Sequence, residues 1–223
     1  MKFTILSIHP KLAAAFAEEG LLAKAKAKGA VQIEAVDIRD FSDAPHHKVD
    51  DKTYGGGPGM ILKPEPIARA LQKIKSEAGV DSKIRTIVLS AKGKKFNQEA
   101  AHRLAKYDQL VFICGRYEGI DERIAEFYAD EEICIGDYVM MGGEVAAAVV
   151  IETVARLLPN VIGNPKSLEA ESFSSEIGTE YEQYTRPPVF EGHEVPAVLQ
   201  NGNHKEIEKW RRKRQGDQGR SKK

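Results

Sequence analysis

The residues of this sequence best suited to binding a small ligand lie in three glycine-containing segments. They are residues 89–93 (LSAKG), 114–123 (CGRYEGIDER) and 135–144 (IGDYVMMGGE), and each follows a short apolar run. Glycine lets the backbone approach a ligand closely, and the exposed N–H and C=O groups suit the edge of a neutral purine. One such segment alone would indicate only a strand-to-helix turn. Three together predict a binding site, because ligands of parallel α/β sheets bind beyond the carboxyl ends of the strands.

Two common nucleotide-binding motifs are absent from the sequence. No GxGxxG follows the first apolar run, and no GxxxxGK[ST] occurs anywhere. The sequence therefore disfavours a Rossmann dinucleotide site and a P-loop. It also disfavours the usual Rossmann-type methyltransferase, which has a glycine-rich turn after its first strand.

The elements that must position these segments alternate along the chain. Strands are expected at residues 3–8, 31–38, 86–89, 110–114 and 132–135. Helices are expected at residues 11–28 with a break at Gly20, at 64–78, at 97–106 with Asn97 as cap, after the cap Asp121, and at 143–158. Short apolar strands separated by helices predict an α/β fold with a parallel sheet covered on both faces. Residues 42–59 show no period, and a loop of that length is usually functional.

The pattern of expected elements changes after Pro159, where the polar residues 160–175 indicate a linker, and we place a domain boundary near residue 162. The 223 residues are 42% hydrophobic and 30% charged, as expected of a globular protein with a sizeable core. Residues 1–200 carry a net charge of −6, and residues 201–223 carry a net charge of +6. A charged helix is expected at residues 203–214, within this basic stretch. A basic end on an acidic body suggests a polyanionic partner, although a solvated tail would have the same composition.

Neither a metal site nor a membrane segment is expected. Cys114 and Cys134 lack zinc-ligand spacing and indicate reduced thiols in a cytoplasmic protein. His46, His47, Asp50 and Asp51 could form a metal site, but adjacent histidines on a strand face opposite ways. The apolar run at the start is too short for a signal peptide, and no stretch of eighteen apolar residues occurs.

Six segments carry a specific resemblance. They are residues 49–60 (VDDKTYGGGPGM), 89–93, 114–123, 135–144, 184–187 (YTRP) and 202–204 (GNH). With these segments the sequence closely resembles the bacterial tRNA (guanine-N1)-methyltransferases, the TrmD family of the SPOUT superfamily. The resemblance runs from the first strand to about Arg214, and CGRYEGIDER followed by IGDYVMMGGE is very specific. It implies a parallel sheet with a deep trefoil knot and a small, mainly α-helical C-terminal domain.

The resemblance implies S-adenosylmethionine as the cofactor. In the family the cofactor lies bent among the three knot loops, whose backbone groups hold the adenine. The corresponding residues here are Leu89, Ser90, Gly115, Tyr117, Cys134, Ile135, Gly136, Tyr138, Val139, Met140, Gly142 and Gly143. Apolar walls from Tyr138 and Met140 agree with such a pocket. Mg²⁺ can assist the family reaction, but no dedicated site for it is visible in the sequence.

The resemblance also assigns the two catalytic roles. Methylation of guanine N1 needs a base for the N1 proton and a cation near O6, where negative charge grows. In the family an arginine supplies the cation, and it corresponds to Arg156 here. Arg156 lies in an otherwise apolar helix, where a buried charge needs a partner. Alternatively, Arg156 only forms an i,i+4 ion pair with Glu152 and has no catalytic role. The base corresponds to Glu171, where the family has aspartate, with Glu169 as second choice.

The family's organisation implies the remaining expectations. Residues 1–161 would form the knotted cofactor-binding and dimerisation domain, residues 162–175 a linker, and residues 176–223 a small helical tRNA-binding domain. The family is a homodimer in which both subunits share each active site. Substrate contacts are expected from Asp50, Glu118, Arg186, His204 and Arg211. The resemblance thus implies methylation of N1 of guanosine 37 of tRNA. The alternative is a weakened or inactive RNA-binding relative that keeps the cofactor pocket, since Glu171 departs from the family's aspartate.

Overall fold

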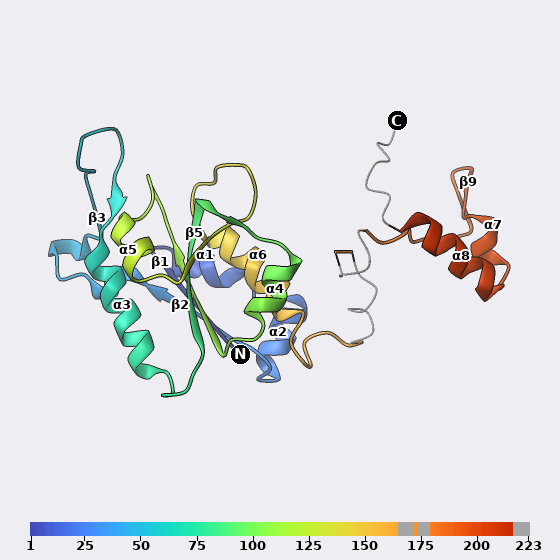
Figure 1. Cartoon of the computed structure of the whole chain (residues 1–223), viewed down its shortest axis with the longest axis horizontal. Helices are drawn as coiled ribbons and strands as arrows, with labels where there is room; N and C mark the ends of the chain where they lie inside the picture. Colours follow the sequence, from blue (N-terminus) through green and yellow to red (C-terminus); the bar gives the residue numbers. More distant parts are fainter. Residues whose placement is uncertain (165–171, 174–178, 216–223) are drawn as a thin grey trace. The chain divides into compact units, whose positions relative to one another are not determined.

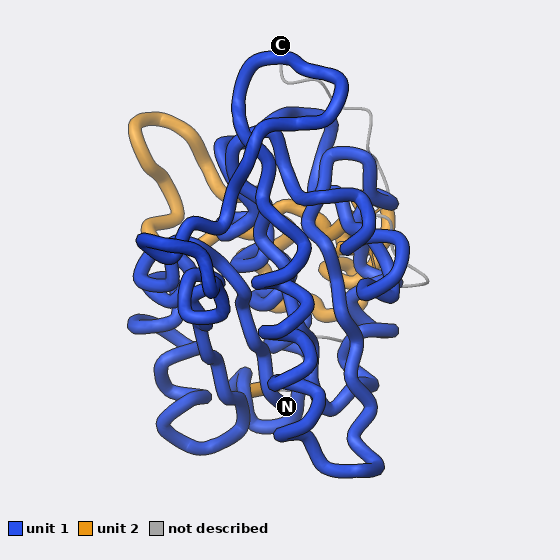
Figure 2. The backbone as a smooth tube through the Cα atoms, turned by 90° about the vertical axis from the view of Figure 1, so that its left-hand side faces the viewer, with its two compact units in different colours: residues 1–163 blue, residues 164–223 orange. Residues whose placement is uncertain are grey.

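The chain divides into two compact units. The computed structural model describes residues 1–164, 172–173 and 179–215. Unit 1 comprises Met1–Gly163 and unit 2 comprises Asn164–Lys223, coloured separately in Figure 2. Each unit is described by itself.

Unit 1 is built on a five-stranded sheet. Its strands are β1 (Lys2–Ser7), β2 (Gln32–Asp37), β5 (Ile84–Lys95), β6 (Gln109–Cys114) and β7 (Glu131–Cys134), in the order β2-β1-β6-β5-β7. Every pair of neighbours is parallel, which confirms the predicted α/β fold with a parallel sheet.

Both faces of this sheet are covered, because successive strand residues point to opposite sides. Leu110 and Phe112 of β6 join one hydrophobic cluster, and Val111 and Ile113 join the other. The first cluster also takes residues from α1 (Pro10–Ala15), α2 (Gly20–Ala27), α4 (Gln98–Leu104) and α6 (Glu144–Ala155). The second takes residues from α3 (Pro64–Glu77) and α5 (Glu122–Phe127). Figure 1 shows the two groups of helices around the sheet.

Two predicted helix caps are confirmed. The Asn97 side chain accepts a hydrogen bond from the Ala100 N–H at the start of α4. The Asp121 carboxylate accepts one from the Arg123 N–H at the start of α5. Such side chains satisfy N–H groups that the first helical turn leaves without a partner. The two caps therefore determine where α4 begins after β5 and where α5 begins after β6.

The expected end of the third strand is wrong. The strand was expected at residues 86–89, but β5 has twelve residues and contains the whole of segment 89–93. Its pairing with β7 shifts register between Leu89 and Lys94, so the segment is an irregularity within a strand. A Cβ on Gly93 would lie 2.6 Å from the backbone of Glu132 and Ile133. The extension of β5 beyond Leu89 could not be predicted from apolar residues, because its residues are mostly polar and are held by backbone pairing with β7.

Two further expectations need correction. The break in helix 11–28 lies at residues 16–19, and Gly20 begins α2 with φ of 70°. Residues 42–59 were expected to lack regular structure, yet they contain the short 3-10 helix Pro45–His47 and the strand β3 (Asp50–Asp51). Strand β3 pairs antiparallel with β4 (Ile61–Leu62). Elements of two or three residues are too short to show a period.

Unit 2 combines a small hairpin with two helices. Strands β8 (Val189–Phe190) and β9 (His193–Glu194) pair antiparallel, and α7 (Ala197–Gln200) and α8 (His204–Arg214) follow. The predicted charged helix is confirmed as α8, and Asn203 caps it. The Trp210 ring makes edge contacts with Tyr181 and Tyr184. Among the described helices of both units, none is long and apolar enough to cross a bilayer.

Candidate functional site

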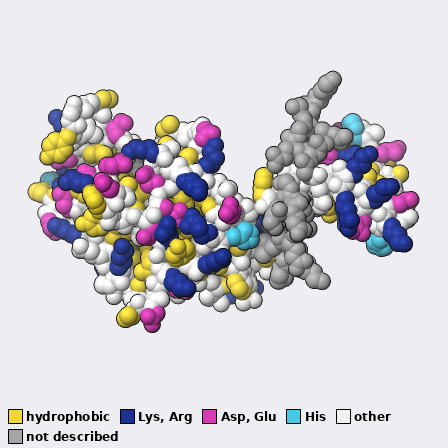
Figure 3. Space-filling model, viewed as in Figure 1, with side chains coloured by type: hydrophobic (Ala, Val, Ile, Leu, Met, Phe, Trp, Pro, Cys, Tyr) yellow, Lys and Arg dark blue, Asp and Glu magenta, His cyan; other side chains and the backbone are white. Residues whose placement is uncertain are grey.

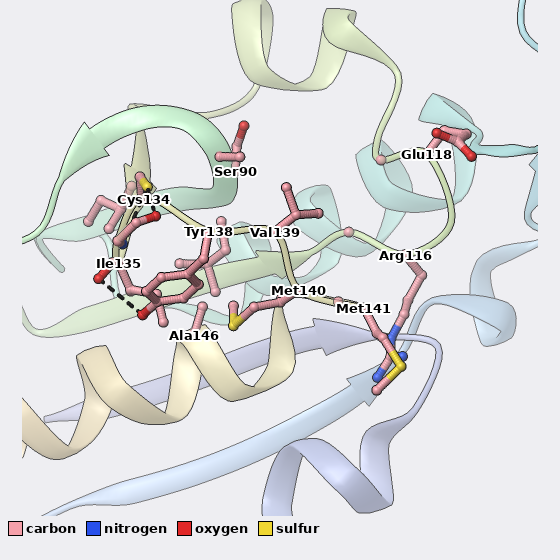
Figure 4. A pocket seen from close by; sticks show the side chains of 18 of the residues that line it. Ser90, Arg116, Glu118, Cys134, Ile135, Tyr138, Val139, Met140, Met141 and Ala146 are labelled. Atoms are coloured by element: carbon pink, nitrogen blue, oxygen red, sulfur yellow. Dashed lines mark hydrogen bonds between the residues drawn. The ribbon is translucent and has the colours of Figure 1, made fainter.

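The three glycine-containing segments meet in one pocket, which lies at the register shift within β5 and beyond the carboxyl ends of β6 and β7 (Figure 4). All twelve residues expected to hold the cofactor line it: Leu89, Ser90, Gly115, Tyr117, Cys134, Ile135, Gly136, Tyr138, Val139, Met140, Gly142 and Gly143. Glu118, expected to contact substrate, also lines it. The structure adds residues that sequence reasoning missed: Ala91, Arg116, Gly119, Ile133, Met141 and Ala146.

A tight turn forms the wall from the second segment. The Gly119 N–H donates to the Arg116 carbonyl at 3.0 Å and closes the turn. Tyr117 within it has φ of 58°, in the left-handed region that non-glycine residues rarely adopt. Such strain persists only where the surroundings impose it, and it is common at binding sites.

Backbone hydrogen bonds from the segment around β4 hold this turn in place. The Leu62 N–H donates to the Gly119 carbonyl and the Glu118 N–H donates to the Met60 carbonyl, each at 3.0 Å. At Gly59, with φ of 87°, an added Cβ would lie 2.9 Å from the carboxyl carbon of Glu118. Glycine at position 59 therefore lets the Glu118 side chain lie against the backbone. This is how the long loop at residues 42–59 contributes to the pocket.

The second and third segments are tied to each other. The Gly143 N–H donates to the Gly115 carbonyl at 3.0 Å, and Arg116 and Gly142 form an isolated antiparallel bridge. An added Cβ on Gly143 would lie 2.8 Å from the Cα of Cys114. Only glycine fits this approach, so the double glycine sets the spacing between the end of β6 and the start of α6.

The end of the pocket formed by the third segment combines backbone groups with apolar walls. The Cys134 Sγ lies 3.0 Å from the Gly136 carbonyl, and the Tyr138 hydroxyl lies 3.4 Å from the Ile135 carbonyl. Figure 4 shows Tyr138, Ile135 and Cys134 at this end, and Arg116 and Glu118 at the other. Backbone polar groups between apolar side chains suit a flat, uncharged heterocycle. The Glu118 carboxylate at the opposite end suits a positively charged part of the same ligand.

A buried ion pair lies beside the pocket. Arg116 Nη2 is 3.0 Å from Glu144 Oε2, and only 1% of the Glu144 side chain is exposed. The Ser7 hydroxyl donates to Glu144 Oε1 at 2.6 Å. Burial, together with the Glu144 charge, raises the pKa of the Cys114 thiol well above its ordinary value. Cys114 is therefore protonated at neutral pH and is not a nucleophile.

The two expected catalytic positions differ in what the structure says of them. Arg156 follows α6 directly, is half-buried, and its N–H donates to the Glu152 carbonyl at 3.2 Å. It is not among the described residues that line the pocket. Glu171 and the second-choice base Glu169 lie outside the described residues.

The other expected substrate residues lie in different parts of the chain. Asp50 is half-buried in β3, away from the pocket lining. Arg186, His204 and Arg211 belong to unit 2 and are exposed. The Arg211 guanidinium lies 4.9 Å from the centre of the Tyr181 ring, a cation–π contact. Figure 3 shows Lys and Arg side chains gathered on the visible face of unit 2.

No metal-ligand cluster occurs within the described ranges, where no three His, Cys, Asp or Glu side chains converge. His46 and His47 both have positive φ, and the His47 Nδ1 lies 3.2 Å from the Arg39 carbonyl. The two histidines thus belong to the short 3-10 helix Pro45–His47 and not to a strand.

Comparison with known proteins identifies the family of the chain. Residues 1–223 match the family described as tRNA (Guanine-1)-methyltransferase TrmD. A tRNA (guanine-N(1)-)-methyltransferase of Desulfatibacillum aliphaticivorans is 48% identical over 211 residues, covering 95% of this chain and 79% of the relative. The enzymes of the same name from Carboxydothermus hydrogenoformans and Borreliella burgdorferi are 49% and 51% identical, covering 96% and 95% of this chain and 82% and 86% of theirs. The chain therefore belongs to the TrmD family of tRNA (guanine-1)-methyltransferases.

Proposed function

We propose that this protein transfers the methyl group of S-adenosylmethionine to N1 of guanosine 37 in tRNA, beside the anticodon. The observation that carries the proposal is the pocket, because twelve residues from three distant segments line one cavity in a chain that matches the family throughout. Its apolar end suits the adenine, and its polar end suits the amino-acid part of the cofactor.

The reaction needs a base and a cation in addition to the pocket. The guanine N1–CH₃ bond forms as the S–CH₃ bond of the sulfonium breaks, which leaves S-adenosylhomocysteine. The N1 proton passes to the carboxylate of Glu171, with Glu169 as second choice. The Arg156 guanidinium stabilises the negative charge that develops on guanine O6. Mg²⁺ assists the transfer, and no cluster of three His, Cys, Asp or Glu side chains is found for it among the described residues.

The assembly proposed around this chemistry is a knotted homodimer in the cytoplasm. Residues 1–161 form the knotted, dimerising domain, residues 162–175 the linker, and residues 176–223 the domain that binds tRNA. Exposed apolar side chains on α6, Val145 at 57% and Val149 at 41%, support self-association. Four basic residues in the last turn of α8 support phosphate contacts. Asp50, Glu118, Arg186, His204 and Arg211 contact the tRNA or its target base.

A methyl-transfer assay tests the proposal. The full chain is incubated with labelled S-adenosylmethionine and with tRNA transcripts that carry guanosine or adenosine at position 37. Label in the guanosine transcript alone, recovered as 1-methylguanosine, is the expected result. Cofactor binding without turnover over a range of pH would instead identify an inactive RNA-binding relative. Absence of cofactor binding would overturn the proposal.

A further inference from the structure

Glu144 is buried in an unusual way for a charged residue. It is 2% exposed, and among the described residues it is the only charged one in the core. It occupies the first position of α6, directly after the double glycine of the third segment. Removing a carboxylate from water is costly unless hydrogen bonds and an opposite charge replace the lost hydration.

The surroundings of Glu144 supply both. Arg116 Nε lies 3.2 Å from Oε1 and 3.0 Å from Oε2, and Arg116 Nη2 lies 3.0 Å from Oε2. The Ser7 hydroxyl donates to Oε1 at 2.6 Å and itself accepts from the His9 N–H at 2.8 Å. The positive end of the α6 dipole also favours a negative charge at this position. One carboxylate thus joins the end of β1, the second segment and the start of α6.

Only one of the three residues in this network lines the pocket. Arg116 is among the pocket residues, whereas Glu144 and Ser7 are not. In Figure 4 the Arg116 side chain leaves the turn and points away from Glu118, toward Met141. Because Arg116 begins the strained turn that contains Tyr117, holding its guanidinium also holds that turn.

Fold stability alone does not explain the ion pair. Well-packed apolar side chains of similar volume often stabilise a core as much as a buried ion pair does. A buried pair gives direction, since its hydrogen bonds are satisfied in only one arrangement of the segments. Because the ion pair of Arg116 and Glu144 joins two walls of the pocket, this fixed arrangement of the segments affects ligand binding.

We propose that Glu144 is a positioning residue that holds Arg116, and through it locks the second and third segments in the shape that binds the methyl donor. The inference rests on the proposed function, in which this pocket binds S-adenosylmethionine. Glu144 is not among the residues that line the pocket, so its loss should weaken donor binding more than it slows methyl transfer.

The test compares Glu144→Gln, Arg116→Gln and the double variant in the full chain. Glu144→Gln keeps the size of the side chain and can still accept from Ser7. We expect a rise of tenfold or more in the dissociation constant and KM for S-adenosylmethionine, with kcat at saturating donor within about threefold of the parent. Since the two residues act as one unit, the double variant should bind the donor no more weakly than the weaker single variant.

Two controls separate positioning from general loss of stability. Thr4→Val removes the buried hydrogen bond from Gln109 to Thr4, which also joins β1 and β6. It should lower the melting temperature without changing donor affinity. Glu144→Asp keeps the charge and should recover part of the affinity lost in Glu144→Gln.

The outcomes distinguish the inference from the proposed function. If the parent protein binds no donor by calorimetry, the proposed function fails. If the parent binds and Glu144→Gln binds equally well, the positioning role is wrong. Additive losses in the double variant, or an equal loss of affinity in Thr4→Val, would also contradict it.

Discussion

At the scale of single residues, the pocket depends on positions where a side chain has no room. The chain passes so close to Cys114 at Gly143 that an added Cβ would lie 2.8 Å from its Cα. At Gly93 the corresponding contact with the β7 backbone is 2.6 Å. Both neighbours are backbone atoms in the sheet, which cannot yield as a flexible side chain can. These glycines therefore set how closely the pocket walls approach each other.

Replacement of Gly143 by alanine should open the pocket. The methyl group forces the start of α6 away from β6 and lengthens the Gly143–Gly115 hydrogen bond. We expect donor affinity to fall at least tenfold, measured by calorimetry, together with a loss of about 1–3 kcal/mol in the free energy of unfolding. Gly163→Ala is the matched control, because no atom of the described residues lies within 4 Å of its added Cβ. Parent-like donor affinity in Gly143→Ala would contradict this role.

The proposed base gives a second prediction at this scale. Glu171→Gln cannot accept the N1 proton, so methyl transfer should fall by about 10²–10⁴-fold while donor binding is kept. Single-turnover rates on tRNA measure the effect. Glu169→Gln is the companion variant: a loss there with normal rates in Glu171→Gln would move the base to Glu169.

At the scale of elements, Glu131 connects three parts of unit 1. Its carboxylate on β7 accepts from Arg85 Nε on β5 at 2.8 Å and from Arg103 Nη2 on α4 at 2.6 Å. Burial works to raise the pKa of Glu131, but hydrogen bonds and charge from Arg103 and Arg85 outweigh it and lower the pKa below the ordinary value of 4.5. Its contribution to stability is therefore complete above pH 4.5 and is lost as pH falls through the lowered pKa.

Glu131→Gln should accordingly destabilise the protein in a pH-dependent way. At pH 7 we expect a loss of about 1–3 kcal/mol in the free energy of unfolding. The difference from the parent should narrow below pH 4.5, as the parent carboxylate takes up its proton. Urea unfolding at several pH values measures this. Glu126→Gln, at an exposed site, should show little difference at any pH. A constant difference for Glu131→Gln would refute the ionic contribution.

At the scale of the whole molecule, the two units differ in what they offer a ligand. Unit 1 carries the apolar pocket, and unit 2 carries a basic helix with aromatic side chains. Arg211 and Arg214 lie over the rings of Tyr181 and Trp210. This combination suits phosphates and unstacked bases. We expect donor affinity to depend on unit 1 and tRNA affinity to depend strongly on unit 2.

Arg211→Ala tests this division. Loss of one phosphate contact should weaken tRNA binding several-fold and reduce the slope of log affinity against log salt by about 1, with donor affinity unchanged. Filter binding at several salt concentrations gives the slope, and calorimetry gives donor affinity. Lys28→Ala, an exposed basic residue of unit 1, is the control. An unchanged slope in Arg211→Ala would exclude a phosphate contact.

The sequence by itself determined the parallel sheet, the caps Asn97 and Asp121, and the three segments around the pocket. These features rest on local signals, namely apolar runs, capping side chains and glycines that come soon after apolar runs. Only the tertiary structure decided the full length of β5, the pairing of β3 with β4, and the network of Ser7, Arg116 and Glu144. Ser7 and Glu144 are 137 residues apart, and their pairing has no periodicity or spacing that a sequence could show. Such contacts depend on how the whole chain packs, because burial and direction are set by neighbours distant in sequence.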